Sequence, residues 1–220
     1  MLQKINWRYA IGEIIIVIIG ITIAFALNNW AMGAKERKMR LIYLDGLITD
    51  LEAEQSHLEE NIATFEANIQ GINGLRPYLY GKKDGRDSIW RKIFEYTKMV
   101  HFQPNDITYK TLVNSGHFHT LNDIQLQKEL EGHYSYHLLV EQDYDRQRTI
   151  HENYFGDFAV YEMDYDAIFR GDYSFMDKKN LRNILNSLYG SFQMASEISK
   201  EAIEKAAAMK VRLEAYRAEQ

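Results

Sequence analysis

The chain has 220 residues, of which 46% are hydrophobic, 26% charged and 13% aromatic; it contains no cysteine. This composition excludes a disordered chain, a disulfide scaffold, a thiolate metal site and a cysteine nucleophile. Residues 1–40 contain six basic and two acidic residues, whereas residues 41–220 contain 20 basic and 29 acidic ones, and so acidic a body is a poor partner for nucleic acid.

The first predicted element is a transmembrane helix over residues 9–30, preceded by a short basic tail at residues 1–8. Residues 10–27 are apolar with two exceptions, and the span is about 32 Å long, close to the hydrocarbon thickness of a bilayer. Aromatic residues, which gather at both membrane interfaces, are expected to anchor it: Trp7, Tyr9 and Trp30. The alternative, a cleaved signal peptide, is less favoured because its Ala-x-Ala pattern at residues 24–26 lies inside the apolar run.

Glu13 is the charged residue within this span. At 3.6 residues per turn it shares a helix face with Gly20 and Ala24, a pair of small residues that lets two helices approach closely. The pattern predicts a transmembrane interface in which Glu13 meets a hydrogen-bond donor. The alternative is a carboxyl group that reaches back to the membrane surface or is protonated.

A basic juxtamembrane segment at residues 31–40 follows the span. Its cationic side chains are expected to contact anionic lipid headgroups: Lys35, Arg37, Lys38 and Arg40. Basic residues flank the span on both sides, but a short charged tail resists translocation, while a long domain is exported largely regardless of its charge. We therefore expect the tail to remain inside and the following domain to lie outside.

Residues 41–220 are predicted to form an elongated all-α bundle, because the chain has only two prolines and no run alternates with the two-residue period of a strand. A long helix is expected over about residues 41–72, ended by Gly71, Gly74 and Pro77. Apolar residues form a heptad seam along it, with Gln55 as its one polar member: Leu41, Leu44, Ile48, Leu51, Leu58, Ile62, Phe65, Ile69 and Ile72. Five glutamates are assigned to positions on or beside the solvent face: Glu52, Glu54, Glu59, Glu60 and Glu66.

A second long helix is expected over about residues 178–218, with Asp177 as its N-cap. It repeats the heptad pattern, with Ser199 as its polar interruption: Leu181, Leu185, Leu188, Phe192, Ala195, Ala202, Ala206, Met209, Leu213 and Tyr216. The two seams predict an antiparallel pair within one chain, which would return the C-terminus towards the membrane. The alternative is a coiled coil between chains.

Shorter helices and loops are expected over residues 77–176. Asn105 or Asp106 is placed to cap a short helix, and Asn122–Asp123 to begin a longer one that continues to about Phe155. Residues 156–176 show no readable period.

Two segments resemble a known family of membrane proteins. The first runs from Tyr9 to Ile21 (YAIGEIIIVIIGI) and continues to Trp30 (NNW), and the second is TYKTLVNSG at residues 108–116, followed by a helix with Leu126 and Leu130. Together they are similar to domain of unknown function 6090, found in bacteria of the Bacteroidota. The resemblance implies a single-pass membrane protein. With the orientation expected above, the chain would lie in a bacterial inner membrane with its domain in the periplasm. The resemblance implies no activity and no catalytic residue.

The candidate chemistry is limited to histidine pairs. His133 and His137 are four residues apart on a predicted helix, and Glu129 and Glu141 extend the stripe by one turn each; imidazole and carboxylate groups can hold a divalent metal ion. The simpler interpretation is a polar or interfacial face with incidental histidines, with Tyr134 and Leu138 as the packing face. A further pair, His117 and His119, lies in a predicted loop.

No sequence motif indicates a nucleophile, a phosphate-binding loop or a cofactor. We therefore expect a non-enzymatic, cofactor-free protein, anchored in the bilayer by one helix, that forms homo-oligomers or binds other envelope proteins. The alternative is a membrane-anchored domain that senses a ligand or a metal ion.

Overall fold

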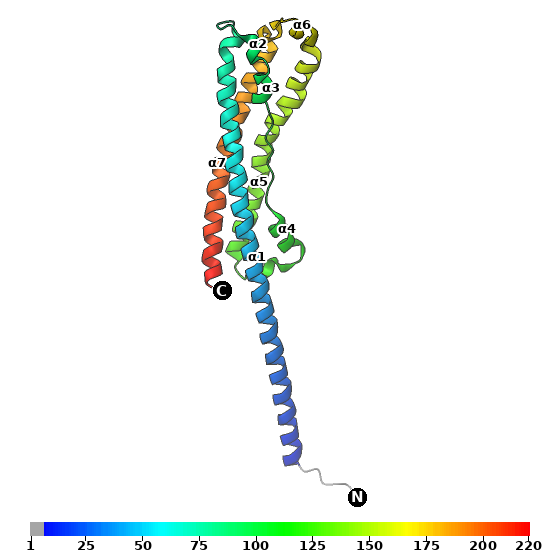
Figure 1. The fold of residues 1–220 in the computed structure, drawn as a ribbon. Helices are drawn as coiled ribbons and strands as arrows, with labels where there is room; N and C mark the ends of the chain where they lie inside the picture. Colours follow the sequence, from blue (N-terminus) through cyan, green and yellow to red (C-terminus); the bar gives the residue numbers. More distant parts are fainter. Residues whose placement is uncertain (1–6) are drawn as a thin grey trace.

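The computed structural model describes residues 7–220, and among these residues it contains seven α-helices and no strand (Figure 1). Short 3₁₀ and π segments connect several of them. The α-helices are α1 (Trp7–Leu79), α2 (Arg86–Ile89), α3 (Lys92–Tyr96), α4 (Ile107–Asn114), α5 (Ile124–Ile150), α6 (Tyr165–Phe169) and α7 (Lys179–Ala218). The predicted all-α class is confirmed. Residues 1–6, which hold most of the predicted basic tail, lie outside the described part of the chain.

The helix α1 carries both the apolar segment and one of the three long helices of the bundle (Figure 1). It has 73 residues and is therefore about 110 Å long. Residues 31–40 do not interrupt it, because they are mostly strong helix formers and contain no proline.

The predicted end of this helix at Gly71, Gly74 and Pro77 is wrong, because α1 continues to Leu79 with Pro77 inside its last turn. Leu75 and Leu79 are buried in the core there. The free energy gained by their burial offsets the loss of the backbone hydrogen bond that proline cannot donate.

Gly71 has a packing role, because the ring of Tyr96 lies against its backbone where a Cβ would be. We expect Gly71→Ala to destabilise the fold by about 1–3 kcal/mol through this clash. Gly74→Ala is the matched control: apart from its chain neighbours and the nearby backbone of its own helix, nothing among the described residues lies within 4 Å of its Cβ position, so it should stabilise the helix by about 0.5–1 kcal/mol. Urea unfolding of both variants measures the difference, and equal effects would contradict the packing role.

The helices α1 and α7 pack antiparallel, and α5 lies beside them (Figure 1). Arg217 Nε lies 2.6 Å from Asp45 Oδ1, and Lys210 Nζ lies 2.6 Å from Glu52 Oε1, so α7 descends as α1 rises. The seam of α7 is buried along its whole length. The predicted intramolecular pair is thus confirmed, and these seams face other helices of the same chain.

The N-cap of α7 differs from the prediction. Lys178 occupies the cap position, and Asp177 instead accepts a hydrogen bond of 2.7 Å from Arg86 Nη1. This ion pair ties α2 to the start of α7, and the guanidinium holds the pKa of the Asp177 carboxyl below its usual value. Of the other predicted caps, the Asp123 side chain accepts a hydrogen bond from Leu126 N, whereas Asp106 occupies the N-cap position of α4 without a side-chain cap hydrogen bond.

The hydrophobic core has two parts. The basal core, nearer the apolar segment, extends to Leu51 on α1 and Ala206 on α7, and the distal core begins at Leu58 and Ala202. A layer of buried polar side chains separates them along α1 and α5.

Candidate functional site

The helix α5 brings two histidines into the bundle. Its buried face alternates at spacings of four and three residues and consists of Leu126, Leu130, His133, His137, Val140, Tyr144 and Gln147, with Tyr134 beside them. His133 and His137 therefore occupy seam positions, where leucine or valine would be expected. Both histidines are buried, so they do not lie on a polar outer face. Of the two residues assigned to the packing face, Tyr134 is buried and Leu138 is exposed.

Glu54 joins these histidines from α1. The assignment of Glu54 to the solvent side is wrong, because its side chain is only 1% exposed. It belongs to a stripe of every seventh residue of α1 that faces α5 and the segment before α4. The stripe consists of Leu47, Glu54, Asn61, Asn68 and Leu75.

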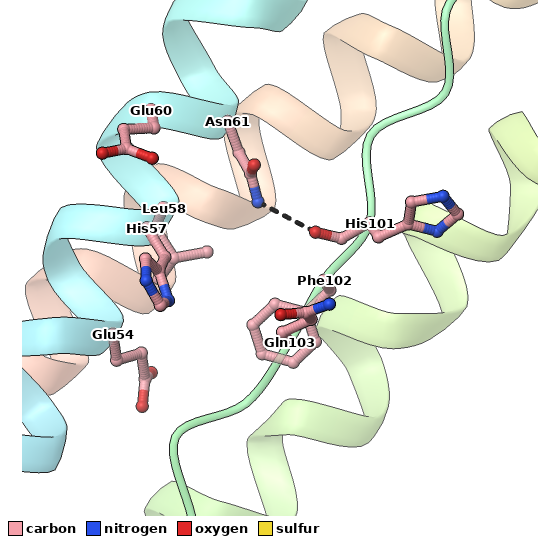
Figure 2. Close-up of a pocket in the computed structure, with 8 residues that line it drawn as sticks. All are labelled: Glu54, His57, Leu58, Glu60, Asn61, His101, Phe102 and Gln103. Carbon is pink, nitrogen blue, oxygen red and sulfur yellow. Dashed lines mark hydrogen bonds between the residues drawn. The ribbon is translucent and has the colours of Figure 1, made fainter.

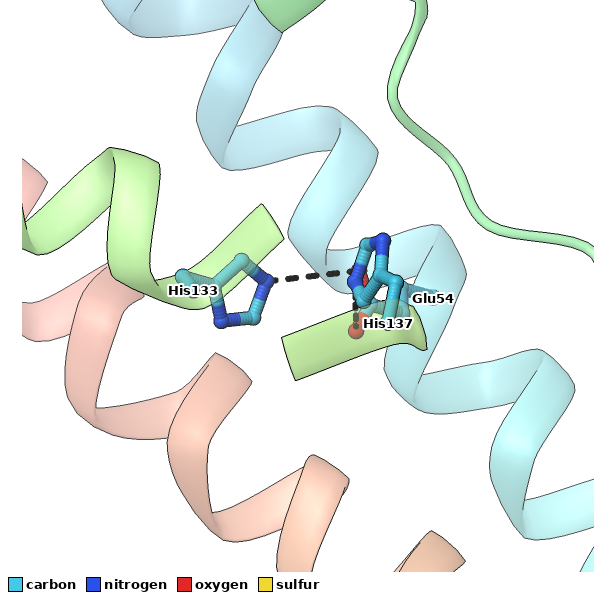
Figure 3. A group of neighbouring side chains, drawn as sticks. All are labelled: Glu54, His133 and His137. Carbon is cyan, nitrogen blue, oxygen red and sulfur yellow. Dashed lines mark hydrogen bonds and ion pairs between the residues drawn. The ribbon is translucent and has the colours of Figure 1, made fainter. Parts of the chain in front are cut away.

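Glu54, His133 and His137 form one compact cluster (Figure 3). His137 Nε2 donates to Glu54 Oε1 over 3.1 Å, and His133 Nε2 lies 3.5 Å from Glu54 Oε2. One candidate ligand atom from each side chain lies within 4.8 Å of the other two. The three residues are thus arranged around one point between α1 and α5.

The electrostatics of the cluster favour an ionised carboxylate. Burial raises the pKa of the Glu54 carboxyl, but the neighbouring rings of His133 and His137 lower it by more than burial raises it, so the pKa lies below its usual value. The ring of Tyr134 contacts both imidazoles. Burial, reinforced by the Glu54 charge, raises the pKa of the Tyr134 hydroxyl, which stays neutral.

The hydrogen bonds of the cluster are incomplete. Within residues 7–220, Glu54 Oε2 and both ring nitrogens of His133 are buried without a hydrogen-bond partner. Such unsatisfied buried groups cost about 1–3 kcal/mol each.

A neighbouring polar layer is, by contrast, well connected. Tyr144 Oη lies 2.7 Å from Ser199 Oγ and accepts a hydrogen bond from Asn61 Nδ2 over 3.2 Å. Gln147 bonds both the N–H and the C=O of Val100. The unsatisfied atoms at Glu54 and His133, together with the buried Tyr134 Oη, therefore contrast with this layer.

A cavity of about 260 Å³ leads from the surface to Glu54 (Figure 2). It lies between α1 and the segment that precedes α4, and its exposed wall carries His57, Glu60 and His101. A second cavity, of about 430 Å³, is lined by His133 and by residues of α5 and α7. The cluster is therefore buried but lies one side chain away from solvent on two sides.

The two glutamates predicted to complete the histidine site lie elsewhere. Glu129 accepts a hydrogen bond of 3.1 Å from Arg212 Nε on α7, and Glu141 is exposed. Four residues turn a helix by 400°, so positions four apart drift by about 40° per step. Glu129 and Glu141 are therefore about 120° apart around α5 and do not converge on one ion.

The residues predicted for a transmembrane interface lie on the first part of α1. Glu13, Gly20 and Ala24 are exposed, and no other part of the described chain approaches the Cβ position of Gly20 within 4 Å. Trp30 is 75% exposed. Trp7 and Tyr9 lie at the start of α1, but their side chains fall outside what the structure describes.

The predicted headgroup residues divide into two groups. Lys35, Arg37 and Lys38 are exposed on α1, whereas Arg40 is half-buried and donates a hydrogen bond to the side chain of Gln220 at the C-terminus. Lys35 also lines a cavity of about 300 Å³. That cavity includes two histidines in a 3₁₀ turn that was predicted as a loop: His117 and His119.

Comparison with known proteins gives one result. Residues 13–191 match a family described as "Family of unknown function (DUF6090)". No curated protein and no solved structure matches the chain. The match includes Glu54, His133 and His137 but ends within α7.

Proposed function

The chain belongs to the family of unknown function DUF6090, and from this premise we propose that it is a non-enzymatic, single-pass membrane protein whose helical bundle binds protein partners. One observation carries the proposal. Among the described residues, α1 is long and apolar enough to cross a membrane: an 18-residue window has a mean hydropathy of 2.3 and none of it is buried. That exposed segment and the bundle share one helix, so the proposed anchor is joined rigidly to the domain.

The proposed location is the inner membrane of a bacterium, with the tail in the cytoplasm and the bundle in the periplasm. Lys35, Arg37 and Lys38 support a membrane boundary near residue 35, because they follow the apolar segment at the level where anionic headgroups would lie. A cleaved signal peptide is less favoured because Ala24 and Ala26 lie within a continuous helix.

The proposed binding surface is the end of the bundle farthest from the apolar segment. Two π-helical segments, His151–Phe155 and Phe158–Glu162, lie there (Figure 1), and π turns are frequent at functional sites. Several large side chains in and after them are exposed: Tyr154, Val160, Tyr161 and Phe169. Aromatic residues are enriched in protein interfaces. This surface is therefore suited to binding a protein, either a different protein or a second copy of this chain.

Charged substitutions in the apolar segment test the anchoring. Ile18→Arg combined with Ile21→Arg should add about 5–7 kcal/mol to the cost of insertion and move the protein from carbonate-washed membranes to the soluble fraction. Ile107→Arg, at an exposed position of α4, should leave it in the membranes. If the double variant stays in the pellet, the apolar segment is not the anchor.

Two further measurements test orientation and partners. A C-terminal phosphatase fusion should be active and a C-terminal fluorescent fusion inactive if the bundle is periplasmic.

A photocrosslinker at residue 161 should give a discrete adduct of the chain with itself or with one protein, whereas the same probe at the exposed Glu197 should not. A lack of adducts from residue 161 would remove the proposed binding surface.

A second function, sensing of a ligand or metal ion by a membrane-anchored domain, is favoured by the cluster of Glu54, His133 and His137. The cluster links α5 to the helix that contains the proposed span. A change at the cluster would therefore act directly on α1.

A further inference from the structure

We propose that Glu54, His133 and His137 form a binding site for a divalent first-row transition metal ion, with Zn²⁺ as the reference ion. Two imidazoles and one carboxylate are a known ligand set for zinc and for other ions of this series. This site would supply the ligand for the sensing function proposed above, so that function depends on it. The site itself does not depend on sensing, because an ion could bind here without producing a signal.

The spacing of the ligand atoms fits one ion. Bonds of 2.0–2.2 Å in tetrahedral geometry place neighbouring ligand atoms about 3.3–3.6 Å apart. His137 Nε2 and His133 Nε2 lie 3.1 and 3.5 Å from the Glu54 oxygens, and the remaining separations reach at most 4.8 Å. A small rotation of the two rings would therefore close the set around an ion.

The unsatisfied atoms point to the same conclusion. Glu54 Oε2 and His133 Nε2 are buried, face each other and lack hydrogen bonds to any other part of residues 7–220. An ion between them would bond both atoms. In the layer of Asn61, Tyr144 and Ser199, by contrast, side chains satisfy one another without an ion.

Burial and charge also fit a cation. The Glu54 carboxylate supplies one negative charge inside the bundle, and neutral imidazoles supply the other two ligands. The fourth position would be filled by water, which the cavity beside Glu54 can admit (Figure 2). His57, Glu60 and His101 on the outer wall of that cavity give an entering ion transient ligands.

The location of the three ligands on two different helices also has a structural consequence. Glu54 lies on α1, and both histidines lie on α5. Among these three side chains, the two helices are joined by the hydrogen bond of His137 and by the 3.5 Å contact of His133, and a bound ion would add a direct link. Metal binding would therefore stabilise the folded bundle, because the site does not exist in the unfolded chain.

The test uses the full-length protein, purified in detergent and stripped with a chelator. We expect one Zn²⁺ or Co²⁺ ion per chain, with Co²⁺ giving the visible absorption of a four-coordinate site. Free Zn²⁺ at about 100 times its Kd should raise the Tm by about 5–10 °C. Absence of both the Co²⁺ spectrum and the Tm shift in the wild-type protein overturns the proposal, whether or not any variant folds.

Matched variants locate the site. Glu54→Gln and His137→Gln should each weaken Zn²⁺ binding at least about 100-fold, since even changes behind the ligands cost 10–100-fold. His119→Gln, at an exposed histidine outside the cluster, should bind like the wild type. Unchanged binding in the cluster variants, with folding verified by circular dichroism, would overturn the assignment. Metal binding without partner crosslinks, or the reverse, separates this inference from the proposed interaction role.

Discussion

Phe65→Ala is expected to destabilise the bundle by about 3–5 kcal/mol. Phe65 is fully buried, and its ring lies 5.2 Å from that of Tyr144 on α5 and 5.8 Å from that of Phe192 on α7. It is therefore the side chain through which all three long helices meet in the distal core. Truncation removes these contacts and leaves a cavity between rigid helices that cannot collapse into it.

Urea unfolding in detergent, followed by circular dichroism, measures this loss. Phe169→Ala is the matched control, because Phe169 is 79% exposed and its truncation should change the free energy of unfolding by less than about 0.5 kcal/mol. Phe65→Leu should fall between the two. A loss below about 1 kcal/mol for Phe65→Ala would mean that the three helices do not share this contact in solution.

The packing of α1 and α7 could be predicted because it follows from a one-dimensional pattern. The positions of Leu44, Leu51, Leu58 and Phe65 repeat at heptad spacing, and all four are buried. The end of α1 could not be predicted in the same way. Gly71 carries no visible signal that Tyr96, 25 residues later in the sequence, would pack on its backbone.

The site could be predicted only in part. The spacing of His133 and His137 places them on one face of α5, but their seam positions become evident only when the alternation of Leu126 and Leu130 is continued through them to Val140. Glu54 could not be assigned to them from the sequence, because the contact joins residues about 80 positions apart. One sequence signal for Glu54 does exist. It lies in the stripe of every seventh residue that begins at the apolar Leu47, and Glu54 is the first polar residue of that stripe.

Replacement of the Glu54 carboxylate by an apolar side chain should destabilise the metal-free bundle. In Glu54→Leu, His137 loses the acceptor of its hydrogen bond, and His133 loses the carboxylate oxygen that lies 3.5 Å from its Nε2. A buried ring N–H left without an acceptor costs about 1–3 kcal/mol, and a loss of about this size is expected from His137. Glu59→Leu, at an exposed position one turn further along α1, should change the free energy of unfolding by less than about 0.5 kcal/mol.

The pH dependence gives this prediction its own signature. The pKa of Glu54 is lower in the folded protein than its ordinary value of 4.5, so the folded state binds this proton less readily than the unfolded chain. The stabilisation from the Glu54 charge is therefore complete above the unfolded pKa and is lost as the pH falls through the folded pKa. The difference in unfolding free energy between wild type and Glu54→Gln, measured in a chelator, should therefore be smaller below about pH 4.5 than above about pH 5.5. A difference that is independent of pH down to acid unfolding would show that the carboxylate charge does not stabilise the cluster. A difference that grows with acid would reverse the sign and place the pKa of Glu54 above its ordinary value.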